Sequence, residues 1–107
     1  MTMQPAKISS QELAEAKNVR IIDIRKAPDD QQIPGSEVMV GDDIESNPPF
    51  TADEKVVLYC GSGNSCSRIA ATLRDRGLNV VALDGGYKAW KEAGLPTDPL
   101  RQTEDDR

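Results

Sequence analysis

Apolar residues gather in short runs along the chain, and each run is bounded by polar or turn-forming residues. The strongest run covers residues 56–60, is β-branched at its start and contains no charged position. Such a run predicts a strand that is buried on both faces of a sheet. Further apolar runs predict strands over residues 19–24, 38–40 and 79–83, and a short edge strand over residues 6–8.

Helical patterns alternate with these strands. Ser9 and Glu12 have the spacing of a capping box, which predicts a helix that continues to residue 16 or 17. Apolar residues recur at helical spacing within residues 66–76, and residues 87–93 predict a third helix that is closed by a glycine. This alternation predicts an α/β fold, in which a central, mostly parallel sheet of about five strands has helices on both faces.

The remaining segments are predicted to be loops. Residues 26–32 form a polar loop, and residues 33–36 form a turn that contains proline and glycine. Residues 41–54 are acidic and contain prolines, which favours a loop with about one helical turn. Residues 98–107 are acidic and predict a disordered tail, so we expect one domain over residues 1–97.

Composition and charge exclude several classes of function. The 107 residues suit one domain, and their net charge of −5 argues against nucleic acid and against an anionic membrane as partners. No apolar run approaches the ~18 residues that span a membrane, and the N-terminus lacks the pattern of a secretory signal. Two cysteines without any histidine exclude the usual zinc spacings and a cysteine–histidine catalytic pair. We therefore expect a reduced, cytoplasmic protein that holds no metal.

Cys60 is the candidate reactive residue, because it ends the most buried strand and small polar residues separate it from the next helix. The first amides of a helix lack internal partners and carry the positive end of its dipole, and glycines let further amides converge there. Such surroundings lower the pKa of a cysteine from ~8.5 to about 3.5–7.5. The candidate anion-binding segment is Gly61, Ser62, Gly63, Asn64, Ser65 and Cys66. A buried structural cysteine that packs as a small hydrophobe is the alternative, and it stays open at this point.

Three separated motifs add to this pattern. Residues 23–25 (Asp-Ile-Arg) precede an Ile-Pro-Gly-Ser turn at residues 33–36, and residues 60–66 form the cysteine loop. Residues 86–90 (Gly-Tyr-Lys-Ala-Trp) precede a Gly-Leu-Pro sequence at residues 94–96. In this order and spacing, the motifs resemble those of the rhodanese family of sulfurtransferases. The resemblance covers most of the chain and implies the three-layer rhodanese-like fold.

The resemblance also implies a sulfurtransferase that works by double displacement without a bound cofactor. The Cys60 thiolate would attack the outer sulfur of a donor, thiosulfate or a persulfide, and become a persulfide itself. A thiol, a partner protein or, in the assay, cyanide would then take the sulfur. Backbone amides of residues 61–66 would bind the anionic sulfur. The side chains of Ser62, Asn64 and Ser65 are expected to cap the helix, and a direct role of one of them in catalysis is the alternative.

Cys66 stands where the family commonly has serine or threonine. In the first helical turn it would present its N–H, and not its sulfur, to the anion, so we expect it to be dispensable for transfer to small acceptors. A second interpretation stays open, in which Cys66 is a resolving thiol that closes a disulfide with Cys60.

Other motif residues have structural interpretations. Asp23 and Arg25 are expected to brace the end of their strand and the following loop. Gly85 and Gly86 are expected to form a turn that requires φ > 0 or a close approach. Trp90 is expected to belong to the core or to the wall of the pocket, because a large aromatic side chain buries well.

The charge of the cysteine loop affects how tightly it can bind a sulfur donor. The loop contains no arginine or lysine, and Arg68 lies inside the following helix. A dianionic donor would meet only backbone amides, a helix dipole and an acidic surface, so we expect weak affinity for thiosulfate. A persulfide or a protein would be the better donor. The acidic residues 42–45 are expected to belong to a solvated loop.

Two other classes of function remain. A cysteine-loop phosphatase or arsenate reductase needs an arginine at the position that Cys66 occupies here. A non-catalytic rhodanese-like module would only bind partner proteins, but such modules often lose the cysteine that this chain keeps. Turnover of thiosulfate with cyanide separates these classes.

Overall fold

The computed structural model describes residues 7–26 and 31–99. Its main sheet has the strand order β1-β6-β5-β2-β4, and every neighbouring pair is parallel. These strands are β1 (Lys7–Ile8), β2 (Arg20–Asp23), β4 (Ser36–Val38), β5 (Val56–Tyr59) and β6 (Val80–Leu83). β5 lies in the centre with all its residues buried, so the run that the apolar pattern marked as most buried is the central strand. β1 is an edge strand, as predicted.

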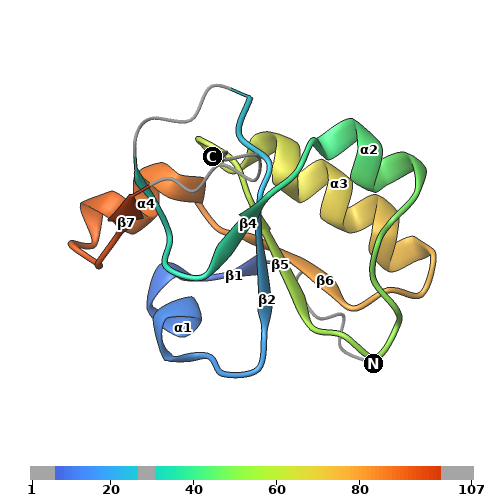
Figure 1. The fold of residues 1–107 in the computed structure, drawn as a ribbon, viewed down its shortest axis with the longest axis horizontal. Helices are drawn as coiled ribbons and strands as arrows, with labels where there is room; N and C mark the ends of the chain where they lie inside the picture. The colour runs from blue at the N-terminus through green and yellow to red at the C-terminus, as the bar shows by residue number, and fades with distance from the viewer. Residues whose placement is uncertain (1–6, 27–30, 100–107) are drawn as a thin grey trace, which may run out of the picture.

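Helices cover both faces of this sheet. They are α1 (Ser10–Glu15), α2 (Gly41–Ser46), α3 (Asn64–Asp75) and α4 (Gly86–Glu92). α2 and α3 lie on one face, and α1 and α4 lie on the other (Figure 1). The predicted three-layer α/β fold is therefore confirmed, and Trp90 of α4, at 3% exposed, is a core residue as predicted. Across the described ranges, no helix is long and apolar enough to cross a membrane.

Alternate residues of β5 enter two separate cores. Val56 and Leu58 pack with apolar residues of α2 and α3, whereas Val57 and Tyr59 pack with those of α1 and α4. Each of the four is at most 2% exposed, and burying an aliphatic side chain such as that of Leu58 contributes about 1.5–3 kcal/mol. Cys60, the next residue, belongs to the first cluster and so lies on the side of α3.

The predicted capping box at the start of α1 is present. Ser9 Oγ accepts a hydrogen bond from the Glu12 amide at 3.0 Å, and the Glu12 carboxylate accepts one from the Ser9 amide at 3.0 Å. The helix ends at Glu15, slightly earlier than predicted.

The turn at residues 33–36 is organised around the hydroxyl of Tyr59. This oxygen accepts a hydrogen bond from the Ile33 amide at 3.2 Å and lies 3.0 Å from Ser36 Oγ. Burial raises the pKa of Tyr59 to about 12, so the phenol stays protonated at neutral pH. With these partners Ser36 can be buried, and β4 begins there, earlier than the predicted strand over residues 38–40. Val40, which we expected in that strand, is 61% exposed and precedes α2.

Two predicted loops contain secondary structure. α2 is a little longer than the single turn expected, and two aspartates occupy its first turn, where the helix dipole favours acids. Gln31–Gln32 forms β3, which pairs antiparallel with β7 (Asp98–Pro99). Thr97 Oγ1 also donates a hydrogen bond to Gln31 Oε1 at 2.8 Å. The predicted disordered tail is therefore wrong for its first two residues, and residues 100–107 lie outside the described residues.

Candidate active site

Cys60 lies at the carboxyl edge of the sheet, directly after the central strand. The residue is 7% exposed and contributes to the wall of a cavity of about 330 Å³. The rest of the wall comes from residues 24–26 after β2, residues 41–42 at the start of α2, the cysteine loop, and α3. Within residues 7–26 and 31–99, no group of His, Cys, Asp or Glu side chains could hold a metal ion.

Hydrogen-bond donors converge on Cys60 Sγ. Cys66 Sγ lies 3.4 Å from it, and the Gly63 amide donates to it at 3.1 Å. The thiol of Cys66 makes the largest contribution to lowering the pKa of Cys60, and the amides of Cys66, Gly63 and Ser65 add to it. Together they lower this pKa to about 5 against the opposing effect of burial, so Cys60 is a thiolate at neutral pH.

The thiol of Cys66 is the donor that the sequence analysis missed. We expected only its N–H to face the anion, but its sulfur contacts Cys60 as well, and the residue is fully buried. The cause is the start of α3 at Asn64: Cys66 is its third residue, and helical side chains lean toward the N-terminus. The hydrogen bond to Cys60 and burial raise the pKa of Cys66 well above its usual range, so Cys66 is the partner that stays protonated. Between two neutral thiols Cys60 would donate to Cys66, but once Cys60 is ionised only Cys66 has a proton to donate across the 3.4 Å.

α3 begins without a side-chain cap. It follows Gly63, which adopts the left-handed conformation with φ +99°. The prediction that Ser62, Asn64 and Ser65 cap this helix is therefore wrong. Ser62 and Ser65 line the cavity together with Gly61, and Asn64 is exposed. The absence of a cap leaves the first amides of α3 available to Cys60.

The first amides of α4 bind carbonyls of the cysteine loop. Tyr87 N donates to Cys60 O at 2.8 Å, and Lys88 N donates to Gly61 O at 3.0 Å. Gly86 has φ +64°, and a Cβ at this position would lie 2.6 Å from Cys60 O. The prediction for this glycine, φ > 0 or a close approach, is thus confirmed, since both are present, and the start of α4 fixes the backbone of the loop.

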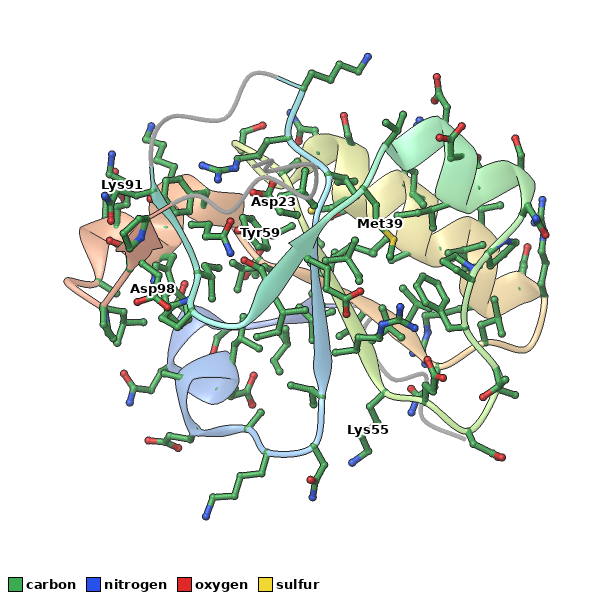
Figure 2. The ribbon with its side chains drawn as sticks, in the orientation of Figure 1. Asp23, Met39, Lys55, Tyr59, Lys91 and Asp98 are labelled. Carbon is green, nitrogen blue, oxygen red and sulfur yellow. The ribbon has the colours of Figure 1, made fainter. Side chains whose placement is uncertain are left out.

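Asp23 and Arg25 form a buried ion pair. Arg25 Nη2 lies 2.7 Å from Asp23 Oδ2, and their side chains are 5% and 0% exposed. The same nitrogen donates to Gln31 O at 2.7 Å, and the guanidinium lies 4.2 Å from the centre of the Tyr87 ring. Figure 2 shows Asp23 near its register partner Tyr59. These contacts confirm the predicted bracing of the strand end and loop.

Three cationic residues line the cavity although the loop itself has none. They are Lys26, Arg68 and Arg25. Arg25 is the one paired with Asp23, and Asp42 belongs to the same wall. The Arg68 guanidinium pairs with Glu45 at 3.3 Å, and its side chain is 61% exposed. The expectation that a donor would meet only amides and a dipole is therefore wrong. The spacing of Ser65 and Arg68, three apart on one helix face, is a signal that could have revealed this arginine.

Comparison with known proteins identifies the family. A model of the Rhodanese-like domain matches residues 9–93. The chain belongs to this family. The region matched in this rhodanese-like chain contains the Asp23–Arg25 pair, the Cys60 loop and the start of α4, so the resemblance seen in the motifs is confirmed.

Relatives of this rhodanese-like chain match part of it. The uncharacterized protein slr1261 of Synechocystis is 42% identical over 50 residues, which cover 46% of this chain and 28% of that protein. The thiosulfate sulfurtransferase GlpE of Actinobacillus succinogenes is 38% identical over 50 residues, 46% of this chain and 45% of that protein. The match thus spans less than half of either relative. The solution structure of the rhodanese-like domain of Alr3790 from Anabaena shares the fold, with a TM-score of 0.76 at 24% identity over 92% of this chain and 81% of that one.

Proposed function

We propose that this chain is a sulfurtransferase that carries sulfane sulfur on Cys60 as a persulfide. The observation that supports it most is a cysteine with a pKa lowered to about 5 in the wall of a cavity at the carboxyl edge of the sheet. The thiolate is the form that attacks sulfur, so Cys60 needs no general base at neutral pH. The relative GlpE, itself named a thiosulfate sulfurtransferase, adds support at the level of the family.

In the first step, the Cys60 thiolate attacks the outer sulfur of thiosulfate. A bond forms between Cys60 Sγ and that sulfur, the S–S bond of thiosulfate breaks, and sulfite leaves with the bonding electron pair. The amides of Gly63, Ser65 and Cys66 stabilise the anionic sulfur. A persulfide, free or on a protein, can replace thiosulfate as the donor in this step.

In the second step, an acceptor attacks the outer sulfur of the persulfide and Cys60 leaves as the thiolate that began the cycle. The acceptor is a small-molecule thiol or a thiol on a partner protein, and cyanide replaces it in the assay. The cycle needs reduced cysteines, and Cys60 and Cys66 are both free thiols. We therefore also propose that the chain works in the reducing cytoplasm.

The two alternatives make different demands on this site. A cysteine-loop phosphatase holds its oxyanion with a bidentate guanidinium, but Cys66 occupies that position and Arg68 pairs with Glu45. A module that only binds partners has no use for a thiolate stabilised by a buried thiol and several amides. Both alternatives therefore explain less of the geometry than sulfur transfer does.

The test combines thiosulfate:cyanide turnover with the intact mass of Cys66→Ser after exposure to thiosulfate. In this variant Cys60 is the only cysteine, and a hydroxyl replaces the thiol donor. We expect thiocyanate from the wild-type chain and a gain of one sulfur on the variant, reversed by dithiothreitol. Absence of both, with thiosulfate and with a small persulfide as donors, would overturn the proposal. Hydrolysis of p-nitrophenyl phosphate in its place would favour the phosphatase class.

A further inference from the structure

Cys66 carries a thiol that the proposed transfer does not consume. Its residue is 0% exposed, and its sulfur lies 3.4 Å from Cys60 Sγ and 4.0 Å from Leu83 O. Cys60 contributes to the wall of the cavity, whereas Cys66 does not. Cys60 therefore has contact both with the cavity, where a donor would bind, and with the buried thiol of Cys66.

This arrangement suits attack by the Cys66 thiol on a persulfide carried by Cys60. The outer sulfur of a Cys60 persulfide would extend into the cavity, which offers room for it. Cys66 is buried and does not line the cavity, so its thiol would approach the inner sulfur from within the protein while the outer sulfur occupies the cavity. The separation of 3.4 Å must shrink by ~1.4 Å to reach a disulfide bond of about 2.05 Å.

We propose that Cys66 is a resolving thiol, which attacks the inner sulfur of the Cys60 persulfide, releases the outer sulfur as sulfide and closes a Cys60–Cys66 disulfide. The inference rests on the proposed function, because it requires the persulfide on Cys60. It adds a second activity, the reduction of sulfane sulfur to sulfide, in the absence of an acceptor.

The step balances without an external oxidant. A bond forms between Cys66 Sγ and Cys60 Sγ, the bond from Cys60 Sγ to the outer sulfur breaks, and the electron pair leaves with that sulfur. The proton of the Cys66 thiol ends on the departing sulfur, so HS⁻ is the product. The two cysteine sulfurs are oxidised by two electrons and the sulfane sulfur is reduced by two.

Formation of the persulfide removes the feature that keeps Cys66 inactive. In the resting site, the hydrogen bond to the Cys60 thiolate is the largest cause of the raised pKa of Cys66. Once Cys60 carries a second sulfur, the negative charge moves to that outer sulfur and the inner one becomes neutral. The pKa of Cys66 then falls toward its ordinary range, so the fraction of Cys66 that is a thiolate, the form that attacks, rises when its target appears.

An external dithiol must return the disulfide to two thiols. Because Cys60 lines the cavity and Cys66 is buried behind it, the incoming thiolate attacks the Cys60 sulfur and Cys66 leaves. A second thiol of the reductant then resolves the mixed disulfide and becomes oxidised itself. The partner class is therefore a dithiol reductant, represented in the test by dithiothreitol.

The experiment exposes the full chain to thiosulfate under anaerobic conditions, without cyanide and without thiols. Sulfide in solution, intact mass and a non-reducing peptide map are measured on the wild type, Cys66→Ser and Cys60→Ser. We expect the wild type to release one sulfide per chain, lose two hydrogens and form a peptide pair joined through Cys60 and Cys66. Cys66→Ser should retain the added sulfur and release no sulfide. Cys60→Ser should gain no sulfur and release no sulfide. Wild type without thiosulfate should keep both thiols.

The outcomes separate this inference from the proposed function. A wild type that gains a sulfur, keeps it and releases no sulfide overturns the inference and leaves sulfur transfer intact. Failure of thiosulfate to load either chain counts against that donor, so inorganic polysulfide is then used to place sulfur on Cys60. Persistence of the persulfide in the wild type after that treatment overturns the inference as well, and failure of polysulfide to load the thiol overturns both proposals. If Cys66→Ser does not fold, the mass and peptide map of the wild type alone decide the question.

Discussion

Two helices, α3 and α4, point their N-termini at the same cysteine loop, and the loop uses them differently. Both follow a glycine in the left-handed conformation, Gly63 with φ +99° and Gly85 with φ +77°, and neither has a side-chain cap. Amides at the start of α3 face the sulfur of Cys60, whereas those of α4 bind the carbonyls of Cys60 and Gly61. The start of α3 therefore sets the charge of the thiol, and the start of α4 sets the position of the backbone that carries it.

Removing the sulfur of Cys60, which faces the start of α3, should have the largest effect. Cys60→Ser should abolish thiocyanate formation, because a serine alkoxide is far harder to form, while the nearly isosteric side chain leaves the fold intact. Turnover with thiosulfate and cyanide is compared with the urea unfolding transition of the same variant. Retained turnover with a normal transition would contradict the role given to Cys60.

Disturbing the start of α4 should damage the site through its geometry. Gly86→Ala places a Cβ within 2.6 Å of the loop backbone at a left-handed φ, so the free energy of unfolding should fall by at least about 1–3 kcal/mol. Gly94→Ala is the matched control, since φ is also positive there but no atom lies within 4 Å of the new Cβ. Urea unfolding of both variants measures the difference. Equal losses would show that the contact with the loop is unimportant.

Removing the buried thiol should alter the charge of Cys60 and leave the backbone in place. Cys66→Ala deletes one charge-assisted hydrogen bond of about 1.5–3 kcal/mol, which raises the pKa of Cys60 by about one to two units. Cys66→Ser keeps a donor and should raise it less. In the wild type, the rate of iodoacetamide alkylation should be half-maximal near pH 5, falling below that pH and levelling above it, because only the thiolate reacts.

An unchanged alkylation midpoint in Cys66→Ala would mean that the amides alone stabilise the thiolate. The result also tests whether Cys66 is dispensable for transfer to small acceptors. We now expect Cys66→Ala to lose turnover first at low pH, where its Cys60 becomes protonated before that of the wild type.

The smallest effect concerns the cations beside α3. Arg68→Ala should raise the KM for thiosulfate by at most about fivefold, because an exposed ion contributes about 0.2–1 kcal/mol. Arg76→Ala is the control, since Arg76 also binds Glu45, through its carbonyl, without lining the cavity. Steady-state kinetics on both variants provide the measurement. An identical KM for Arg68→Ala and the wild type would exclude this arginine from binding the donor.

The sequence analysis predicted the order of the elements and the place of Cys60 because both depend on local patterns. A continuous apolar run followed by glycines can be interpreted from neighbouring residues alone. The orientation of Cys66 depended on where α3 begins, and a start two residues earlier than expected turns its sulfur toward Cys60. Helix boundaries are the least certain part of such an interpretation, and here one boundary decided which atoms touch.

Features that depend on distant segments were missed. Lys26 and Asp42 line the cavity because the segment after β2 and the start of α2 meet at the same edge of the sheet, and no local pattern shows this. β4 starts at Ser36 because the hydroxyls of Ser36 and Tyr59 meet in the core. The polarity of Ser36 argued for a turn, and its burial depends on a partner more than twenty residues away along the chain.

The pairing of β3 with β7 also has a consequence for the order of folding. It joins Gln32 to Asp98, nearly two thirds of the chain apart, so the cost in loop entropy is high and the pairing should form late. β3 carries the Gln31 carbonyl that binds Arg25, whose guanidinium in turn lies over Tyr87 at the start of α4. A chain that emerges from the ribosome can therefore assemble its central strands before residue 98 is made, but the wall around Cys60 is complete only when the last described strand has joined.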